Sequence, residues 1–259
     1  MVGNRARLVS HIAMALLVLW TSMSVAQEDE GLHQEKFATS DQCIACHSQL
    51  FDAEGNDVSI GHAWRATMMA NSAKDPYWHA GVRREVIDHP QAQAAIEDKC
   101  STCHMPMART IANARGESGK IFDHLQGTAE IPSESAYAWD GVSCTACHQI
   151  RADNFGEHSS FDGGFIIDMS ASEDRPIYGP FDVDAGRETI MKSAANFVPG
   201  ESSHVQKSEL CATCHTLFTD AMDDNGNVVA KFPEQVPYLE WQHSSYRDTE
   251  SCQDCHMPE

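Results

Sequence analysis

All ten cysteines of this chain lie in five copies of one pattern, Cys-x-x-Cys-His. Two cysteines three positions apart on a helical turn lie on one face, where their thiols can bond to the two vinyl groups of one haem. The histidine that follows can bind the iron of the same haem. The pattern predicts five covalently bound haem c groups, held by Cys43, Cys46, Cys100, Cys103, Cys144, Cys147, Cys211, Cys214, Cys252 and Cys255, with His47, His104, His148, His215 and His256 as proximal iron ligands.

Other cysteine chemistries account for fewer of these residues. Zinc ribbons pair two Cys-x-x-Cys units for each metal and need no histidine after each unit, and five units do not divide into pairs. A thioredoxin-like redox site would explain one unit and leave four. Disulfides are common in exported proteins, but every cysteine here belongs to a unit that ends in histidine. Haem attachment is the interpretation that uses all ten.

Further histidines are candidates for the second axial ligand of each iron. Five haems need at most five such ligands. The candidates are His33, His62, His79, His89, His124, His158, His204 and His243. Of these we expect His62, His89, His124, His204 and His243 to bind iron, which would give bis-histidine coordination throughout.

His204 precedes the fourth unit in the segment SSHVQKSELCATCH. This segment predicts a helix that is capped by Ser202 or Ser203 and continues into the unit. Along such a helix His204 lies about 16 Å of axial rise from His215, which is too far for both to bind one iron. We therefore expect His204 to bind the iron of a neighbouring haem.

The same reasoning applies to His89. It is followed by Pro90, a residue favoured in the first turn of a helix, and then by good helix formers up to Cys100. The argument holds more loosely for His243, nine residues before Cys252.

An internal repeat supports His62. After CIACH the chain has the acidic turn segment SQLFDAEGNDV and then HAW, whereas after CATCH it has TLFTDAMDDNGNVV and later WQH. Each half then reaches a unit that ends in CHMP. The repeat makes His62 and His243 counterparts, and it makes the C-terminal SCQDCHMPE the counterpart of CSTCHMPM. The stretch DAMDDNGN (220–227) lacks the alternating acidic spacing of a calcium loop and reads as a solvated turn.

The fifth distal position is contested. His124 follows the turn-rich segment GESGK, which would let it fold back over a haem, and we prefer it to His158. His33 and His79 have no argument beyond their residue type and remain alternatives.

Methionine is a rival iron ligand. Met68 and Met69 lie in WRATMMANSAK, where helical spacing favours packing in the core over ligation. Met105 directly follows the proximal His104, and we expect it to pack in the core as well.

The N-terminus has the pattern of a signal peptide, because Arg5 and Arg7 precede the apolar run IAMALLVLW and the small residues SVA. That run is much shorter than the ~20 residues that span a bilayer. We expect cleavage after residue 26, a polar segment over residues 27–40 and a pentahaem domain over residues 41–259. The mature chain would be periplasmic or extracellular, without a transmembrane segment.

The formal charge of the whole chain is −20 at pH 7. Phosphate backbones bind basic surfaces, so nucleic acid is not an expected partner. The acidity fits either solubility or the attraction of basic partner proteins.

The expected fold is mainly α with extensive loops and little β structure. It would be organised around a stack of five haems, because the macrocycles must supply much of the hydrophobic core. The widest gap between units, from Cys147 to Cys211, reads as loop with at most a short hairpin.

With these features the sequence resembles the multihaem c-type cytochromes, and within them the tetrahaem cytochrome of ammonia oxidisers and its larger relatives. The resemblance runs from about residue 40 to the end, in CSTCHMPM, GVSCTACHQI, SELCATCHTLFT, PYLEWQHSSY and SCQDCHMP. It implies haem pairs in stacked and perpendicular packing, mostly bis-histidine iron, and electron transfer in respiration outside the cytoplasm.

Three functions follow from this interpretation. The leading one is an electron carrier whose partners are other cytochromes or a quinol-oxidising complex. The second is an oxidoreductase of the nitrite or hydroxylamine type with one open haem, although the chain has no Cys-x-x-Cys-Lys unit. The third is a protomer of an extracellular filament that assembles through the C-terminal haem. Only three residues follow His256. Earlier segments of the chain or a partner would then have to cover the last haem. The alternative, which we favour slightly, is that the chain is the front part of a longer cytochrome.

Overall fold

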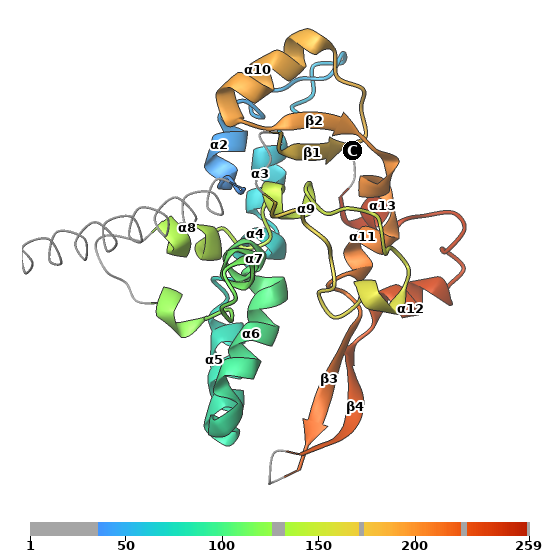
Figure 1. Cartoon of the computed structure of the whole chain (residues 1–259). Coiled ribbons are helices and arrows are strands. Elements are labelled where there is room, and N and C mark those ends of the chain that lie inside the picture. The colour runs from blue at the N-terminus through green and yellow to red at the C-terminus, as the bar shows by residue number, and fades with distance from the viewer. Residues whose placement is uncertain (1–35, 126–132, 171–173, 224–226, 258–259) are drawn as a thin grey trace, which may run out of the picture. The chain divides into compact units, whose positions relative to one another are not determined.

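The computed structural model describes residues 36–125, 133–170, 174–223 and 227–257 (Figure 1). The expected signal peptide (1–26) and His33 lie outside these residues. Residues Phe37–Glu259 form one compact unit. No helix among the described residues is both long and apolar enough to cross a membrane.

Helices make up most of the regular structure that the model describes. Proline occupies the first turn of several of them, where its fixed φ suits a helix and its missing N–H costs no hydrogen bond. The helices are α2 (Ser40–Ile44), α3 (Ile60–Arg65), α4 (Met68–Asn71), α5 (Pro76–Asp88), α6 (Gln93–His104), α7 (Pro106–Ala114), α8 (Ser133–Trp139), α9 (Cys144–Cys147), α10 (Ala185–Ala195), α11 (Ser208–Ala212), α12 (Pro237–Gln242) and α13 (Cys252–His256), with 3-10 turns η1 (Pro90–Ala92), η2 (Phe122–His124), η3 (His158–Ser160) and η4 (Ser203–Gln206).

The helices α5 to α8 contribute to the first buried apolar cluster, which contains Ala73, Val82, Met105, Ala108, Ile121 and Ala138. Met105 is fully buried, as the sequence predicted. The predicted core packing of Met68 is wrong, because this side chain is 68% exposed. Thr67 is extended (φ −83°, ψ 160°) and caps α4, so α3 and α4 are separate short helices and Met68 does not continue the buried face of a longer one.

Two smaller clusters involve the segment that precedes α2. Phe37 packs with Met107, Ile111 and Ala146, and Ala38 packs with Ile177 and Phe197. The end of the segment that reads as polar in the sequence (27–40) is therefore buried against the domain.

A parallel pair of strands occupies part of the widest gap between the cysteine units. Strand β1 (Pro176–Gly179) pairs with β2 (Val198–Glu201) in parallel, and α10 lies between them in the chain. The sequence predicted loop with at most a short hairpin here, and this prediction is wrong. The gap holds helix α10 and a parallel strand pair, which needs a crossover where an antiparallel hairpin needs only a turn. Asp184 caps α10 by accepting from the backbone N–H groups of Gly186 and Arg187, and the left-handed Asn196 (φ 57°) ends it.

The second sheet is an antiparallel hairpin of β3 (Leu217–Met222) and β4 (Val228–Gln235). It follows the fourth cysteine unit directly, and Figure 1 shows it extending from α11 and α12. The turn predicted over 220–227 is wrong for residues 220–222, which end β3, and residues 224–226 lie outside the described residues. Beyond β3 the backbone N–H of Asp223 donates to the carbonyl oxygen of Asn227 (2.9 Å).

Candidate haem attachment sites

We number the five cysteine units in chain order as motif 1 (43–47), motif 2 (100–104), motif 3 (144–148), motif 4 (211–215) and motif 5 (252–256). Each begins in a helical turn or lies within a helix. In motifs 1, 3 and 4 the histidine N–H donates to the carbonyl oxygen of the first cysteine, at 2.8, 2.9 and 2.8 Å, and motifs 2 and 5 lie inside α6 and α13. All ten cysteines are free thiols. This is the local geometry that haem attachment needs.

Two of the expected proximal histidines are held through Nδ1. His104 Nδ1 lies 3.0 Å from the Ser72 carbonyl oxygen, and His148 Nδ1 lies 2.6 Å from the Tyr178 carbonyl oxygen. A carbonyl accepts only from a protonated nitrogen, so each ring keeps its Nε2 lone pair for a metal, as in known metal-binding histidines. Burial lowers the pKa of His104, which favours the neutral, metal-binding imidazole.

Thiols of different motifs contact one another. Cys43 of motif 1 lies beside Cys144 of motif 3, and the interaction of the two thiols raises the pKa of Cys43 and lowers that of Cys144. Cys103 of motif 2 pairs with Cys214 of motif 4 in the same way, with the pKa of Cys103 raised and that of Cys214 lowered. Motif 1 therefore lies beside motif 3, and motif 2 beside motif 4.

Motif 4 has two further neighbours. The pKa of Cys211 is raised to about 12, first by burial and then by the nearby thiol of Cys252 of motif 5. The pKa of Cys147 of motif 3 is also raised to about 12, by burial and by its proximity to Cys214 and Cys211. The motifs follow the spatial order 1, 3, 4, 5, with motif 2 joined at motif 4.

Hydrogen bonds outside the cysteines tie motif 1 to motif 3. The backbone N–H and the hydroxyl of Ser40 each donate to the Asp140 carboxylate at 2.7 Å. Gly141 follows with φ +65°, and a Cβ there would lie 2.6 Å from the Met69 carbonyl oxygen, so this turn before motif 3 requires glycine.

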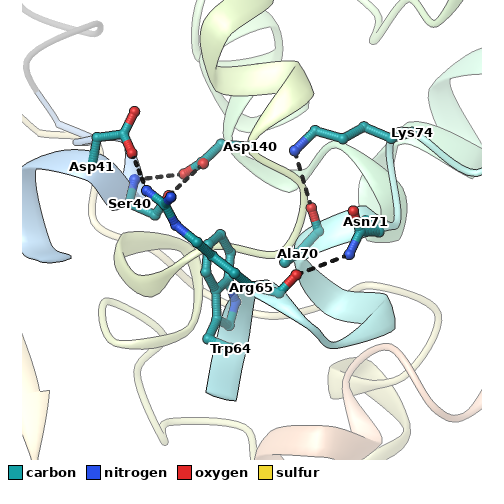
Figure 2. Close-up of a pocket in the computed structure, with 8 residues that line it drawn as sticks. All are labelled: Ser40, Asp41, Trp64, Arg65, Ala70, Asn71, Lys74 and Asp140. Carbon is teal, nitrogen blue, oxygen red and sulfur yellow. Dashed lines mark hydrogen bonds and ion pairs between the residues drawn. The ribbon is translucent and has the colours of Figure 1, made fainter. Parts of the chain in front are cut away.

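A polar pocket of about 350 Å³ lies beside Ser40 and Asp140, as Figure 2 shows. Arg65 reaches across its mouth to an ion pair with Asp41, and Lys74 points to the Ala70 carbonyl oxygen. The lining residues are Ser40, Asp41, Trp64, Arg65, Ala70, Asn71, Lys74 and Asp140. The pocket is thus a charged surface beside motif 1, with cations and carboxylates facing one another.

Motif 5 is hydrogen-bonded to the segment that precedes motif 4. The Cys252 N–H donates to Ser208 Oγ (3.0 Å), and the Gln253 amide donates to the carbonyl oxygens of Val205 and Lys207 (3.0 and 2.9 Å). Ser208 stands three residues before Cys211, as Ser40 stands three residues before Cys43.

The internal repeat is visible in the turns after motifs 1 and 4. The Asn56 N–H donates to Asp52 Oδ1 at 2.7 Å, and the Asn227 N–H donates to Asp223 Oδ1 at 2.8 Å. In both turns the aspartate N–H donates back to the asparagine carbonyl oxygen, at 3.1 and 2.9 Å. The two turns therefore share one hydrogen-bonding pattern.

Two tryptophans extend the repeat and correct its pairing. Trp64 Nε1 donates to the Val142 carbonyl oxygen (3.0 Å), two residues before motif 3. Trp241 Nε1 donates to the Glu250 carbonyl oxygen (2.8 Å), two residues before motif 5. In these contacts SCQDCHMPE is the counterpart of motif 3, not of CSTCHMPM. The sequence signal for this pairing was the serine that directly precedes the first cysteine of both motif 3 and motif 5.

The expected distal ligands His62 and His243 lie in the two halves of the repeat, but the prediction that they are counterparts is wrong, because His62 stands two residues before Trp64 and His243 two residues after Trp241. His62 is an exposed residue of α3. His243 follows α12, and its Nδ1 lies 2.7 Å from the Leu239 carbonyl oxygen, which leaves Nε2 available to a metal.

His89 and His124 flank the helices of the first cluster. His89 ends α5 and precedes η1, so the expected start at Pro90 is a 3-10 turn that leads into α6. His124 ends η2, with Nδ1 3.1 Å from Ser135 Oγ, and burial lowers its pKa. The Trp139 indole N–H donates to the His124 carbonyl oxygen (2.7 Å) and fixes the backbone there.

The continuous helix predicted from Ser202 to motif 4 is wrong. The segment is the 3-10 turn η4, then the extended Lys207 (φ −96°, ψ 139°), then α11. The Ser202 hydroxyl pairs with His204 Nδ1 (2.6 Å) instead of capping a helix, and the carbonyls of Val205 and Lys207 turn to Gln253.

His204 is buried, and both of its ring nitrogens have partners. Its Nε2 lies 2.8 Å from the Ile150 carbonyl oxygen. To bind iron through Nε2, His204 would have to exchange this contact for the metal.

The alternative ligands are also described. His79 Nε2 lies 2.8 Å from the Ala73 carbonyl oxygen, and the exposed His158 stacks on Phe218 with 6.3 Å between ring centroids. Met69 is half-buried.

Within the described residues, no three His, Cys, Asp or Glu side chains converge to hold a metal ion. The porphyrin of a haem supplies four iron ligands, so the chain needs to supply only one or two ligands at each site. Comparison of the chain with family models, with curated proteins and with solved structures gives no match.

Proposed function

We propose that this chain is an exported multihaem c-type cytochrome that carries electrons and holds five covalently bound haem c groups. The observation that carries the proposal is the shared geometry of the five motifs. Each presents two free thiols and a histidine from one helical turn, and a thiol S–H can add across a vinyl group without losing any atom. The proximal ligands would be His47, His104, His148, His215 and His256.

Bound haem supplies one-electron chemistry, and the chain would supply the spacing between the sites. Cys43 lies beside Cys144 and Cys103 lies beside Cys214, so motifs 1 and 3 are neighbours, as are motifs 2 and 4. The contacts around Cys211 join those pairs to motif 5. We infer that electrons move along the spatial order 1, 3, 4, 5, with motif 2 as a branch at motif 4.

Axial ligation by histidine on both sides of each iron would favour electron transfer over substrate binding. His243 best supports the distal assignment, because its Nδ1 is held by a backbone carbonyl. The other proposed distal ligands are His62, His89, His124 and His204. On binding iron, His204 would give up its contact with the Ile150 carbonyl oxygen.

The proposed partners are redox proteins, namely other cytochromes or a quinol-oxidising complex outside the cytoplasm. The charge of −20 would attract a basic docking face and accelerate the encounter at low salt. Association that slows steeply with ionic strength would support this part of the proposal.

The test is production of the chain in a host that attaches haem c, followed by a haem count and low-temperature EPR of the oxidised protein. The expected result is five haems per chain, resistant to acid-acetone extraction, with only low-spin ferric signals. Fewer than five covalent haems would contradict the cofactor assignment. A high-spin signal together with turnover of nitrite or hydroxylamine would replace the carrier with an enzyme.

A further inference from the structure

The proximal histidine of motif 2 is stacked on a tryptophan. The rings of Trp78 and His104 are 4.2 Å apart between centroids and only 4° from parallel. This contact covers one face of the imidazole and restricts its rotation about the side-chain bonds.

The histidine is held on its edge as well as on its face. Ser72 accepts from His104 Nδ1 through its carbonyl oxygen (3.0 Å) and donates from its hydroxyl to the His104 carbonyl oxygen (3.0 Å). Ser72 therefore fixes the direction of the ring, and Trp78 fixes its plane.

Trp78 is itself well anchored. It lies near the start of α5, where the Asp75 side chain caps the helix by accepting from the Tyr77 N–H (2.9 Å). Its side chain packs against the buried cluster that contains Val82 and Met105. The neighbouring Tyr77 points to solvent and is 86% exposed.

We propose that Trp78 is a positioning residue for the motif 2 haem, which fixes the plane of the His104 imidazole relative to the porphyrin and to the distal ligand. The inference rests on the proposed haem attachment and extends it to one site. The orientation of an axial imidazole sets the splitting of the iron d orbitals, and therefore the g values of a low-spin ferric haem. The π face of the indole also stabilises the partial positive charge that the ligand carries on ferric iron.

The experiment compares Trp78→Leu, Trp78→Phe and the control Tyr77→Leu in the full chain with haem attached. The haem count is measured first, followed by low-temperature EPR and a potentiometric titration. In Trp78→Leu the low-field g value of one of five low-spin signals is expected to shift, and one midpoint potential to rise. Trp78→Phe keeps a smaller aromatic ring against His104. Its g value and its midpoint potential should therefore lie between those of Trp78→Leu and those of the wild type. Tyr77→Leu should leave all five signals in place.

The outcomes separate this inference from the proposed function. Five covalent haems with unchanged EPR signals in Trp78→Leu would overturn the role of Trp78 and leave the cytochrome proposal intact. A wild-type chain without covalent haem would remove both. If Trp78→Leu does not accumulate with five haems, Trp78→Phe decides, because its smaller ring must still give a measurable shift of one signal.

Discussion

Trp64 and Trp241 make the same hydrogen bond in two distant parts of the chain. Each indole N–H donates to the carbonyl oxygen that stands two residues before a Cys-x-x-Cys-His motif, Val142 for motif 3 and Glu250 for motif 5. Each also follows a motif and an Asp-Asn turn of one design. The domain is therefore built from two related halves, each holding a pair of motifs, with motif 2 and its helices inserted into the first half.

Replacing either tryptophan with phenylalanine should loosen one motif pair and spare the other. Each change removes one hydrogen bond, and we expect a loss of about 1 kcal/mol of unfolding free energy, measured by guanidinium titration. Trp64→Phe should disturb the EPR signals assigned to motifs 1 and 3, and Trp241→Phe those of motifs 4 and 5. Identical spectral changes in both variants would contradict the two-half arrangement.

The double change Cys252→Ala and Cys255→Ala should remove one covalent haem and leave four, because both attachment points of motif 5 are lost. The measurement is the mass of the intact chain together with the haem absorbance per chain. Met257→Ala, at an exposed residue beside the motif, is the matched control and should retain five. Retention of five haems by the double variant would show that motif 5 is not an attachment site.

His243→Ala should convert one low-spin ferric haem to high spin, since this change removes a proposed distal ligand whose Nε2 faces no described partner. His79→Ala is the comparison, because its Nε2 is already bound to the Ala73 carbonyl oxygen. EPR of the oxidised protein reads both variants directly. A high-spin signal in His79→Ala, with His243→Ala unchanged, would reverse the assignment.

Helix α13 should loosen in acid. Ser251 donates to Asp254 from its backbone N–H and its hydroxyl (2.6 and 2.8 Å), and these bonds lower the pKa of Asp254 below its ordinary 3.8. A lowered carboxyl pKa stabilises the fold above the unfolded value, and this contribution is lost as the pH falls through the folded value. The motif 5 signal in a spectroscopic acid titration should therefore change below pH 3.8.

The control for this acid step is Asp254→Asn, which cannot gain or lose a proton at that position. The variant should show no such step in the motif 5 signal. Persistence of the step in Asp254→Asn would assign it to another group.

Several local features were predictable from the sequence because few neighbouring residues decide them. The helical turn of each motif needs only a hydrogen bond between residues four apart. The turn from Asp52 to Asn56 forms in the same way from one side chain and its nearby backbone. Helix α10 was missed, because the sequence analysis took this gap for loop, although Asp184 is a favoured N-cap residue and Asn196 a favoured left-handed C-cap.

Features that depend on distant residues were beyond such reasoning. The helix expected from Ser202 into motif 4 is broken because Gln253 captures the carbonyl oxygens of Val205 and Lys207. The indole that covers His104 comes from another helix, and no local pattern marks Trp78 as its partner.

The sequence by itself determined the local shape of the motifs, since spacing alone puts two cysteines and a histidine on one turn. The tertiary structure decided which motifs are neighbours. Ser40 and Asp140 stand 100 residues apart in the chain, and their hydrogen bonds bring motif 1 to motif 3. Contacts of this kind arise from the packing of whole helices and loops, so only the folded chain sets the order in which the five sites meet.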